Sequence, residues 1–165
     1  MEGLPAVGRA LDLGCGDGRL GASLDARELV AADVSAVALE RARRRLPAAE
    51  TVLVEPDTPL PFEDSSFDLV LCAETLEHVR DVQLLVSEAR RVLRPGARLA
   101  LTTPAHGRLA GLDVLVRGFE RRFDPLSPHI RFFTARSLAS LLAGLGFDVL
   151  AQRRRSRTLL VEATR

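Results

Sequence analysis

Apolar and polar positions along the chain follow two different periods, and these predict a series of strands and helices. Short apolar runs bounded by turn residues predict strands at residues 9–13, 28–33, 51–54, 67–73, 98–102, 147–152 and 158–163. Segments with an apolar position every three or four residues predict helices at 36–46, 82–93, 112–123 and 135–145, and a short helical stretch at 17–26.

Residues with the chemistry of helix ends flank three of these helices. Ser35, Asp81 and Thr134 come directly before a helical pattern and have side chains that can cap its N-terminus. The residues that end the same patterns are Pro47, Pro95-Gly96 and Gly146. The segment 55–66 is rich in proline and acidic residues, so we expect a loop there.

The order of the elements predicts the fold class. Five strands joined by helices or long loops, followed by two strands close enough for a hairpin, indicate a doubly wound α/β fold. We expect a Rossmann-like, mostly parallel seven-stranded sheet with a C-terminal antiparallel hairpin that places one reversed strand at the edge. The 165 residues have the length of one domain, so residues 1–165 are assigned to a single unit. Ligands of such sheets bind at the carboxyl ends of the strands.

A glycine-rich loop follows the first predicted strand. Gly16, Gly18 and Gly21 match the GxGxxG pattern of dinucleotide-binding folds, which makes an NAD-dependent oxidoreductase one alternative. Asp12 and Asp17 would place two carboxylates beside a pyrophosphate, however, and like charges repel. S-adenosylmethionine has no phosphate and carries a sulfonium and an ammonium group. The acidic residues therefore favour S-adenosylmethionine over NAD.

Further acidic residues stand at the ends of the next two strands. Gly14 and Gly16 allow the backbone to turn sharply and to approach a ligand closely, since glycine has no Cβ. Asp33 ends the second strand, 19 residues after Gly14, where a carboxylate accepts hydrogen bonds from ribose hydroxyls. Asp57 follows the third strand and suits an adenine amino group. Each acid alone also fits an ordinary loop or cap; together they indicate a nucleoside site.

Five segments in this order resemble class I S-adenosylmethionine-dependent methyltransferases, in the small-molecule group typified by ubiquinone and menaquinone biosynthesis. They are RALDLGCGDGRL, VAADVS, EPDTPLPFEDSSFDLVLCAETLEHV, RVLRPGARLALTTP and HIRFFTARSLASLLAGLGF, and the resemblance covers residues 8–165. It implies S-adenosylmethionine as cofactor and methyl transfer as the reaction. The implied cofactor contacts are Asp12, Gly14, Cys15, Gly16, Asp33, Val34, Asp57 and Thr58, with Ala73 or Glu74 beneath the methionine end.

The sequence departs from this family before the first strand. Family members usually carry some tens of residues there, which cover the cofactor and part of the acceptor pocket, whereas about eight precede residue 9 here. We therefore expect an open site, a site covered by residues 105–130 as a substrate-covering insertion, one covered by a second copy or another protein, or a shortened sequence. A catalytically inactive, methyltransferase-like partner subunit is the non-enzymatic alternative.

The composition excludes several other classes. All 23 basic residues are arginine, and the lack of lysine excludes a P-loop, a Schiff-base enzyme and ribose methylation that depends on lysine. There is no Pro-Pro pair for methylation of base amino groups and no Pro-Cys pair for methylation of cytosine carbon. With 22 acidic residues the net charge is only +1, so the clusters 43–45 and 153–155 read as solvated surface and nucleic acid is not an expected partner.

Two further expectations concern location and thiols. No apolar run approaches the roughly 20 residues of a membrane span, and the first ten residues do not have the order of a signal peptide, so we expect a cytoplasmic protein. Cys15 and Cys72 lie in apolar runs, where small buried thiols are the ordinary interpretation.

The acceptor side is defined by a cluster of titratable residues. Glu74, Glu77 and His78 stand at i, i+3 and i+4 after the fourth strand, so one helical turn would gather them on one face. Three interpretations are open: a helix start with local packing, a general base at His78, and a divalent metal site completed by the later His129. We name His78 and His129 as catalytic candidates and expect no tightly bound metal.

The acceptor itself is predicted only by class. The apolar positions of the helix expected at 112–123 include two phenylalanines, which suggests a hydrophobic acceptor. The prediction is a methyltransferase that acts on a small, apolar acceptor, with O-methylation favoured.

Overall fold

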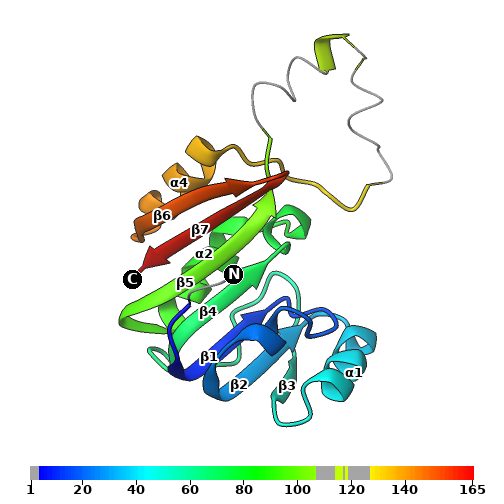
Figure 1. Cartoon of the computed structure of the whole chain (residues 1–165), viewed down its shortest axis with the longest axis vertical. Coiled ribbons are helices and arrows are strands. Elements are labelled where there is room, and N and C mark those ends of the chain that lie inside the picture. The colour runs from blue at the N-terminus through cyan, green and yellow to red at the C-terminus, as the bar shows by residue number, and fades with distance from the viewer. Residues whose placement is uncertain (1–3, 107–113, 117, 119–126) are drawn as a thin grey trace.

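The computed structural model describes residues 4–106, 114–116, 118 and 127–165, and one seven-stranded sheet runs through it in the order β3-β2-β1-β4-β5-β7-β6 (Figure 1). The strands are β1 (Val7–Leu13), β2 (Ala26–Asp33), β3 (Glu50–Leu53), β4 (Phe67–Ala73), β5 (Leu93–Pro104), β6 (Asp148–Arg155) and β7 (Thr158–Thr164). The helices are α1 (Ala36–Arg45), α2 (Val82–Val92) and α4 (Ala135–Gly144), with 3₁₀ turns η1 (Gly21–Ser23) and η2 (Leu76–His78). The predicted mostly parallel α/β sheet is confirmed.

One strand of the sheet is reversed, and it does not lie where the sequence placed it. Strands β1 to β5 pair in parallel, whereas β7 is antiparallel to both of its neighbours, β5 and β6. The prediction of a reversed edge strand was therefore wrong, because β7 is internal and β6 forms the edge. The residues explain this order. Leu159, Val161 and Ala163 of β7 are buried, whereas β6 ends in three exposed arginines, which suit an edge strand.

The predicted caps are present at all three helices. The Ser35 side chain accepts a hydrogen bond from the backbone N–H of Ala38 at 3.2 Å. The Asp81 carboxylate accepts one from Leu84 at 2.9 Å. At α4, Thr134 and Ser137 form a reciprocal capping box. The helix starts could be predicted because capping is a local interaction.

Two predicted boundaries were wrong. Residues 17–26 form no α-helix, but only the 3₁₀ turn η1, because Gly18 has a positive φ of 77° and β2 already starts at Ala26. Strand β5 begins at Leu93, directly after α2, and not at residue 98. Leu93 pairs with Phe67, and the register then shifts around the Pro95-Gly96 turn.

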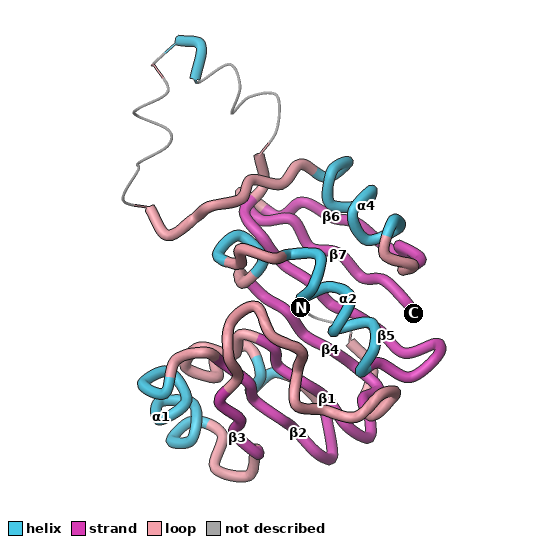
Figure 2. Tube along the Cα trace, turned by 180° about the vertical axis from the view of Figure 1, so that it is seen from behind, coloured by secondary structure: helices cyan, strands magenta, loops and turns pink. Residues whose placement is uncertain are grey.

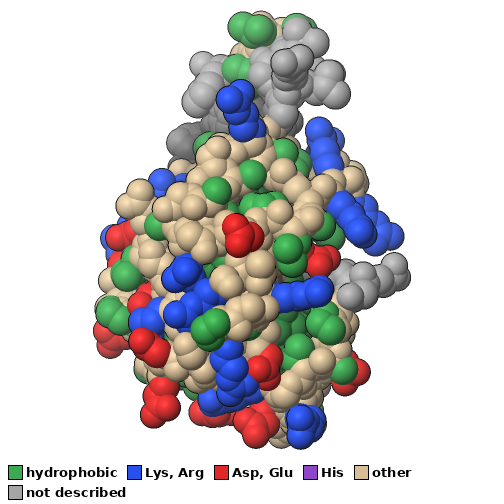
Figure 3. Space-filling model, turned by 90° about the vertical axis from the view of Figure 1, so that its left-hand side faces the viewer, with side chains coloured by type: hydrophobic (Ala, Val, Ile, Leu, Met, Phe, Trp, Pro, Cys, Tyr) green, Lys and Arg blue, Asp and Glu red, His purple; other side chains and the backbone are tan. Residues whose placement is uncertain are grey.

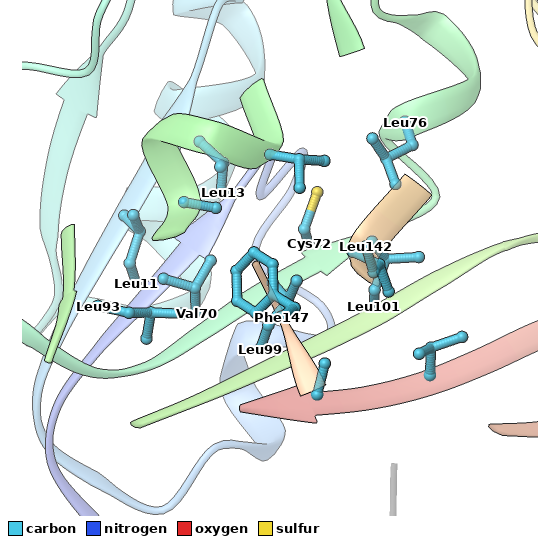
Figure 4. Close-up of a cluster of buried hydrophobic side chains, with 14 of the residues drawn as sticks. Leu11, Leu13, Val70, Cys72, Leu76, Leu93, Leu99, Leu101, Leu142 and Phe147 are labelled. Atoms are coloured by element: carbon cyan, nitrogen blue, oxygen red, sulfur yellow. The ribbon is translucent and has the colours of Figure 1, made fainter. Parts of the chain in front are cut away.

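Helices cover the two faces of the sheet unequally. Helices α2 and α4 lie on one face (Figure 2) and pack on alternate strand residues such as Leu11 and Val70. Helix α1 packs on the other face, against Ala31. Both cysteines are buried and free, as predicted, and Figure 4 shows the Cys72 sulfur among leucine side chains of the core.

The surface carries charges of both signs. Figure 3 shows basic and acidic side chains mixed over one face of the molecule. Within the described part of the chain, no helix is both long and apolar enough to cross a membrane. The helix predicted at 112–123 falls mostly outside the described residues, of which 114–116 are helical.

Candidate functional site

A cavity of about 390 Å³ opens at the carboxyl ends of β1, β2 and β4. Its walls come from the glycine loop after β1, the end of β2, the loop 54–60, the β4–η2 connection and the start of α2. Of the predicted site residues, the following line it: Gly14, Gly16, Asp33, Val34, Asp57, Thr58, Glu74 and His78. The volume is within the range of small-molecule sites.

The glycine loop is held against the end of β2. The backbone N–H groups of Gly14 and Cys15 both donate to the carbonyl of Ala32. Gly14 and Gly16 have positive φ angles of 76° and 54°. A Cβ on Gly14 would lie 2.4 Å from Oγ1 of Thr75, whereas a Cβ on Gly16 would meet no atom within 4 Å. Gly14 is thus required for packing of the loop, and Gly16 faces open space at the cavity.

Asp33 is the most firmly positioned carboxylate of the cavity. Its Oδ2 accepts a hydrogen bond from the Gly16 N–H at 2.8 Å, and its Oδ1 accepts one from the Ser35 N–H at 2.9 Å. A carboxylate has about four acceptor positions, so both oxygens can still accept hydrogen bonds from a ligand. The neighbouring Val34 side chain is 58% exposed and offers an apolar surface.

Asp57 is engaged by protein groups on the other side of the cavity. The Arg80 guanidinium lies 2.7 Å from its Oδ2, and Oδ1 accepts a weak hydrogen bond from the Asp81 N–H at 3.2 Å. Thr58 donates to the carbonyl of Glu55. These contacts tie the loop 54–60 to the start of α2. Sequence reasoning missed Arg80 and the apolar wall residues Leu60, Val79, Leu84 and Leu85, because they depend on how that loop folds back.

Three predicted cofactor contacts do not line the cavity: Asp12, Cys15 and Ala73. Asp12 is buried beside Gly21, whose Cβ would lie 2.5 Å from its Oδ2. Burial raises the pKa of Asp12 to about 7, and the nearby Asp33 charge adds to this, while the Gly21 amide opposes it. Burial likewise raises the pKa of Cys15 to about 12, and this side chain packs with α1.

The β4–η2 connection separates the three residues that the sequence grouped. Glu74 has a positive φ of 50° and is exposed at the cavity wall. Because η2 starts only at Leu76, Glu74 lies outside the turn, while Glu77 is buried and His78 is exposed. The expectation that one helical turn gathers Glu74, Glu77 and His78 on one face was therefore wrong.

The structure instead brings Glu77, His78 and His129 together, and we call these three residues the Glu-His cluster. The rings of His78 and His129 are 4.8 Å apart between centroids, and one potential ligand atom from each residue lies within 4.8 Å of the others. Thr103 donates to Oε2 of Glu77 at 3.0 Å. Burial raises the pKa of the Glu77 carboxyl, with the Thr103 hydrogen bond opposing. This cluster could hold a metal ion.

The segment 127–133 holds His129 in place. The backbone N–H groups of Ile130 and Arg131 both donate to the Glu77 carbonyl, and the Arg131 guanidinium donates to the carbonyl of Val79. Ala105 forms a β-bridge with Phe133 at the far end of the segment. His106 lies there as well, at the carboxyl end of β5 as expected, and its backbone N–H donates to Phe133. This docking was not predictable, because it joins residues about fifty positions apart.

Comparisons with known proteins agree with this geometry. The family profile of a methyltransferase domain matches residues 11–101. A demethylmenaquinone methyltransferase of Clavibacter sepedonicus is 42% identical over 134 residues, which cover 76% of this chain and 52% of that protein. A malonyl-[acyl-carrier protein] O-methyltransferase of Enterobacter lignolyticus is 35% identical over 150 residues, which cover 88% and 57%.

The fold has the same relatives. The crystal structure of a putative methyltransferase of Bacillus halodurans superimposes with a TM-score of 0.82 at 19% identity, over 98% of this chain and 94% of that one. The chain spans about half the length of most of the curated relatives that it matches.

Proposed function

The chain belongs to the class I S-adenosylmethionine-dependent methyltransferases, and from this premise we propose that it transfers the sulfonium methyl group to an oxygen atom of a small, apolar acceptor. S-adenosylmethionine is the cofactor of this family. We take residues 1–165 as one methyltransferase domain, with the segment 105–130 on its acceptor side.

The observation that carries the proposal is the position of Asp33 at the mouth of the cavity. Its carboxylate is fixed by the Gly16 and Ser35 amides and keeps acceptor capacity for the ribose hydroxyls. In the proposed complex the ribose lies over Asp33, the adenine lies on Val34 and the loop that carries Asp57 and Thr58, and the methionine part passes Gly14.

The methionine end is proposed to lie toward the β4–η2 connection. Glu74 lines that wall and carries a carboxylate for the methionine ammonium group. Asp12 and Cys15 would act from beneath the loop, where the Asp12 carboxyl stabilises the cationic cofactor without touching it. Ala73 ends β4 below the same position.

The acceptor is proposed to enter on the side of His78 and His129. His78 lines the cavity, and the exposed apolar residues Ile130 and Phe132 flank His129 on the segment 127–133. The acceptor oxygen attacks the methyl carbon in line with the sulfur; the C–S bond breaks and its electron pair stays on sulfur, giving S-adenosylhomocysteine. Most of the rate then comes from alignment of the two reactants, and the two imidazoles hold the acceptor oxygen as it loses its proton.

The named relatives support oxygen and small acceptors. One is named for O-methylation, and another for methylation of demethylmenaquinone, an apolar molecule. An NAD-dependent oxidoreductase is disfavoured, because Asp33 and Asp57 at the cavity wall and Asp12 below the loop would repel a pyrophosphate. A second copy or another protein over the acceptor side stays a prediction.

Calorimetric titration tests the proposal. S-adenosylmethionine and S-adenosylhomocysteine should each bind at one site, and NAD should not bind. Transfer of a labelled methyl group to hydroxylated quinone or acyl compounds would then identify the acceptor. Binding of NAD without binding of S-adenosylmethionine would overturn the proposed function.

A further inference from the structure

The Glu-His cluster has the donor set of a metal centre. One carboxylate and two imidazoles lie with their potential ligand atoms within 4.8 Å of one another. Two histidines and one glutamate are a set that catalytic zinc sites use, with the remaining position left to water or substrate. The cluster stands beside the cofactor cavity, since His78 belongs to the wall of both.

Glu77 provides an independent observation. Its side chain is 1% exposed, and its Oε2 is satisfied by Thr103. Its Oε1 is buried and receives no hydrogen bond from any residue within 4–106, 114–116, 118 or 127–165. A buried carboxylate oxygen without a donor is costly, and a cation bound to it removes that cost.

The two histidines are prepared for binding as well. Nδ1 of His78 lies 3.1 Å from the carbonyl oxygen of Pro128. A carbonyl only accepts, so this contact makes Nδ1 the protonated nitrogen and leaves the lone pair on Nε2, which is the arrangement of most metal-bound histidines. His129 follows Pro128 directly, and the two hydrogen bonds to the Glu77 carbonyl from residues 130 and 131 fix its backbone against Glu77.

We propose that Glu77, His78 and His129 bind one divalent transition-metal ion, Zn²⁺ above all, and that this ion holds the acceptor oxygen. The proposal rests on the proposed methyl transfer and names how that site activates its acceptor. The ion lowers the pKa of the bound hydroxyl, whose proton leaves to water; the resulting oxyanion attacks the methyl carbon, and the C–S electron pair stays on sulfur. The sequence favoured a cluster without metal, and the geometry points to the opposite.

Zinc binding to the whole chain, without cofactor or acceptor, tests the site directly. After dialysis against chelator and then buffer, titration with ZnCl₂ should show one site of micromolar affinity or tighter, and MgCl₂ should bind at least tenfold more weakly. Glu77→Gln and His129→Ala should each weaken zinc binding at least tenfold. Circular dichroism establishes that each variant is folded, and His129→Ala keeps the test usable if Glu77→Gln does not fold.

The chain supplies matched controls for both kinds of ligand. Glu74→Gln removes a carboxylate three residues from Glu77, and His106→Gln removes the one histidine outside the cluster. Both should bind zinc as the unmodified chain does. Equal affinity in the control and cluster variants would mean adventitious binding and would overturn the proposal.

Cofactor titration separates the two proposals. If S-adenosylmethionine binds and zinc does not, the metal site is wrong and the proposed methyl transfer stands. If zinc binds at the cluster and S-adenosylmethionine does not bind, the proposed function fails while the metal site remains.

Discussion

Asp33 accepts a hydrogen bond from the backbone N–H of Gly16, and this 2.8 Å contact joins the loop after β1 to the end of β2. Because the two strands are neighbours in the sheet, the contact fixes the position of the carboxylate relative to the cavity. The same carboxylate is thus both a structural tie and the proposed ribose ligand.

Asp33→Ala should weaken binding of S-adenosylmethionine ten- to a hundredfold. Charged hydrogen bonds contribute about 1.5–3 kcal/mol each, and loss of one corresponds to that range of affinity. Calorimetric titration measures the change. Asp148→Ala, an exposed residue at the start of β6, is the control, and an unchanged dissociation constant in a folded Asp33→Ala variant would remove Asp33 from the site.

Gly16→Val and Gly14→Val should fail in different ways. A Cβ on Gly16 meets no atom, so Gly16→Val should abolish cofactor binding with a small loss of thermal stability from its positive φ. A Cβ on Gly14 meets Thr75 at 2.4 Å, so Gly14→Val should lower the melting temperature markedly as well. Scanning calorimetry with and without S-adenosylmethionine compares the two, and normal cofactor binding by Gly16→Val would contradict the proposed approach of the ligand.

The stability of the protein should fall as the pH rises from about 4 to 7, owing to Asp12. Its pKa is about 7 in the folded chain against 3.8 for an ordinary aspartate. Between these values the folded state binds more protons than the unfolded state, so the free energy of unfolding decreases with rising pH. The full effect is roughly 3–4 kcal/mol.

Denaturant unfolding of Asp12→Asn at several pH values checks this expectation. The variant should lose the Asp12 contribution between pH 4 and 7 and exceed the unmodified chain in stability above pH 7. Asp148→Asn should follow the unmodified chain. A pH profile of Asp12→Asn parallel to that of the unmodified chain would show that Asp12 is ionised in the folded protein throughout.

Much of this fold was predictable because its signals are local. The run 67–73 was predicted to the residue as β4, since a strand covered on both faces is apolar along its whole length. The caps at Ser35, Asp81 and Thr134 are local as well. The stretch 17–26 was not predictable, because glycines with positive φ break a pattern that otherwise resembles a helix.

The candidate site divides in the same way. The acids at strand ends predicted Asp33 and Asp57 at the cavity, because carboxyl ends of parallel strands meet at one edge. The strand alternation that buries Asp12 was visible in principle, but the likeness to known motifs outweighed it. The contact between His78 and His129 could not be predicted, since it depends on where the segment 127–133 docks.

The last prediction separates the roles of the two histidines in turnover. If both bind an ion that holds the acceptor, His78→Ala and His129→Ala should lower the turnover number similarly, by about 10² to 10⁴, and leave the affinity for S-adenosylmethionine within a few fold. Chelator should abolish activity of the unmodified chain, and added Zn²⁺ should restore it. If His78 acts instead as a general base without metal, chelator should have no effect, His78→Ala alone should be damaging, and the acid limb of its pH–rate profile should disappear. The comparison of the two variants with and without chelator therefore distinguishes an ion that activates the acceptor from an imidazole that takes its proton.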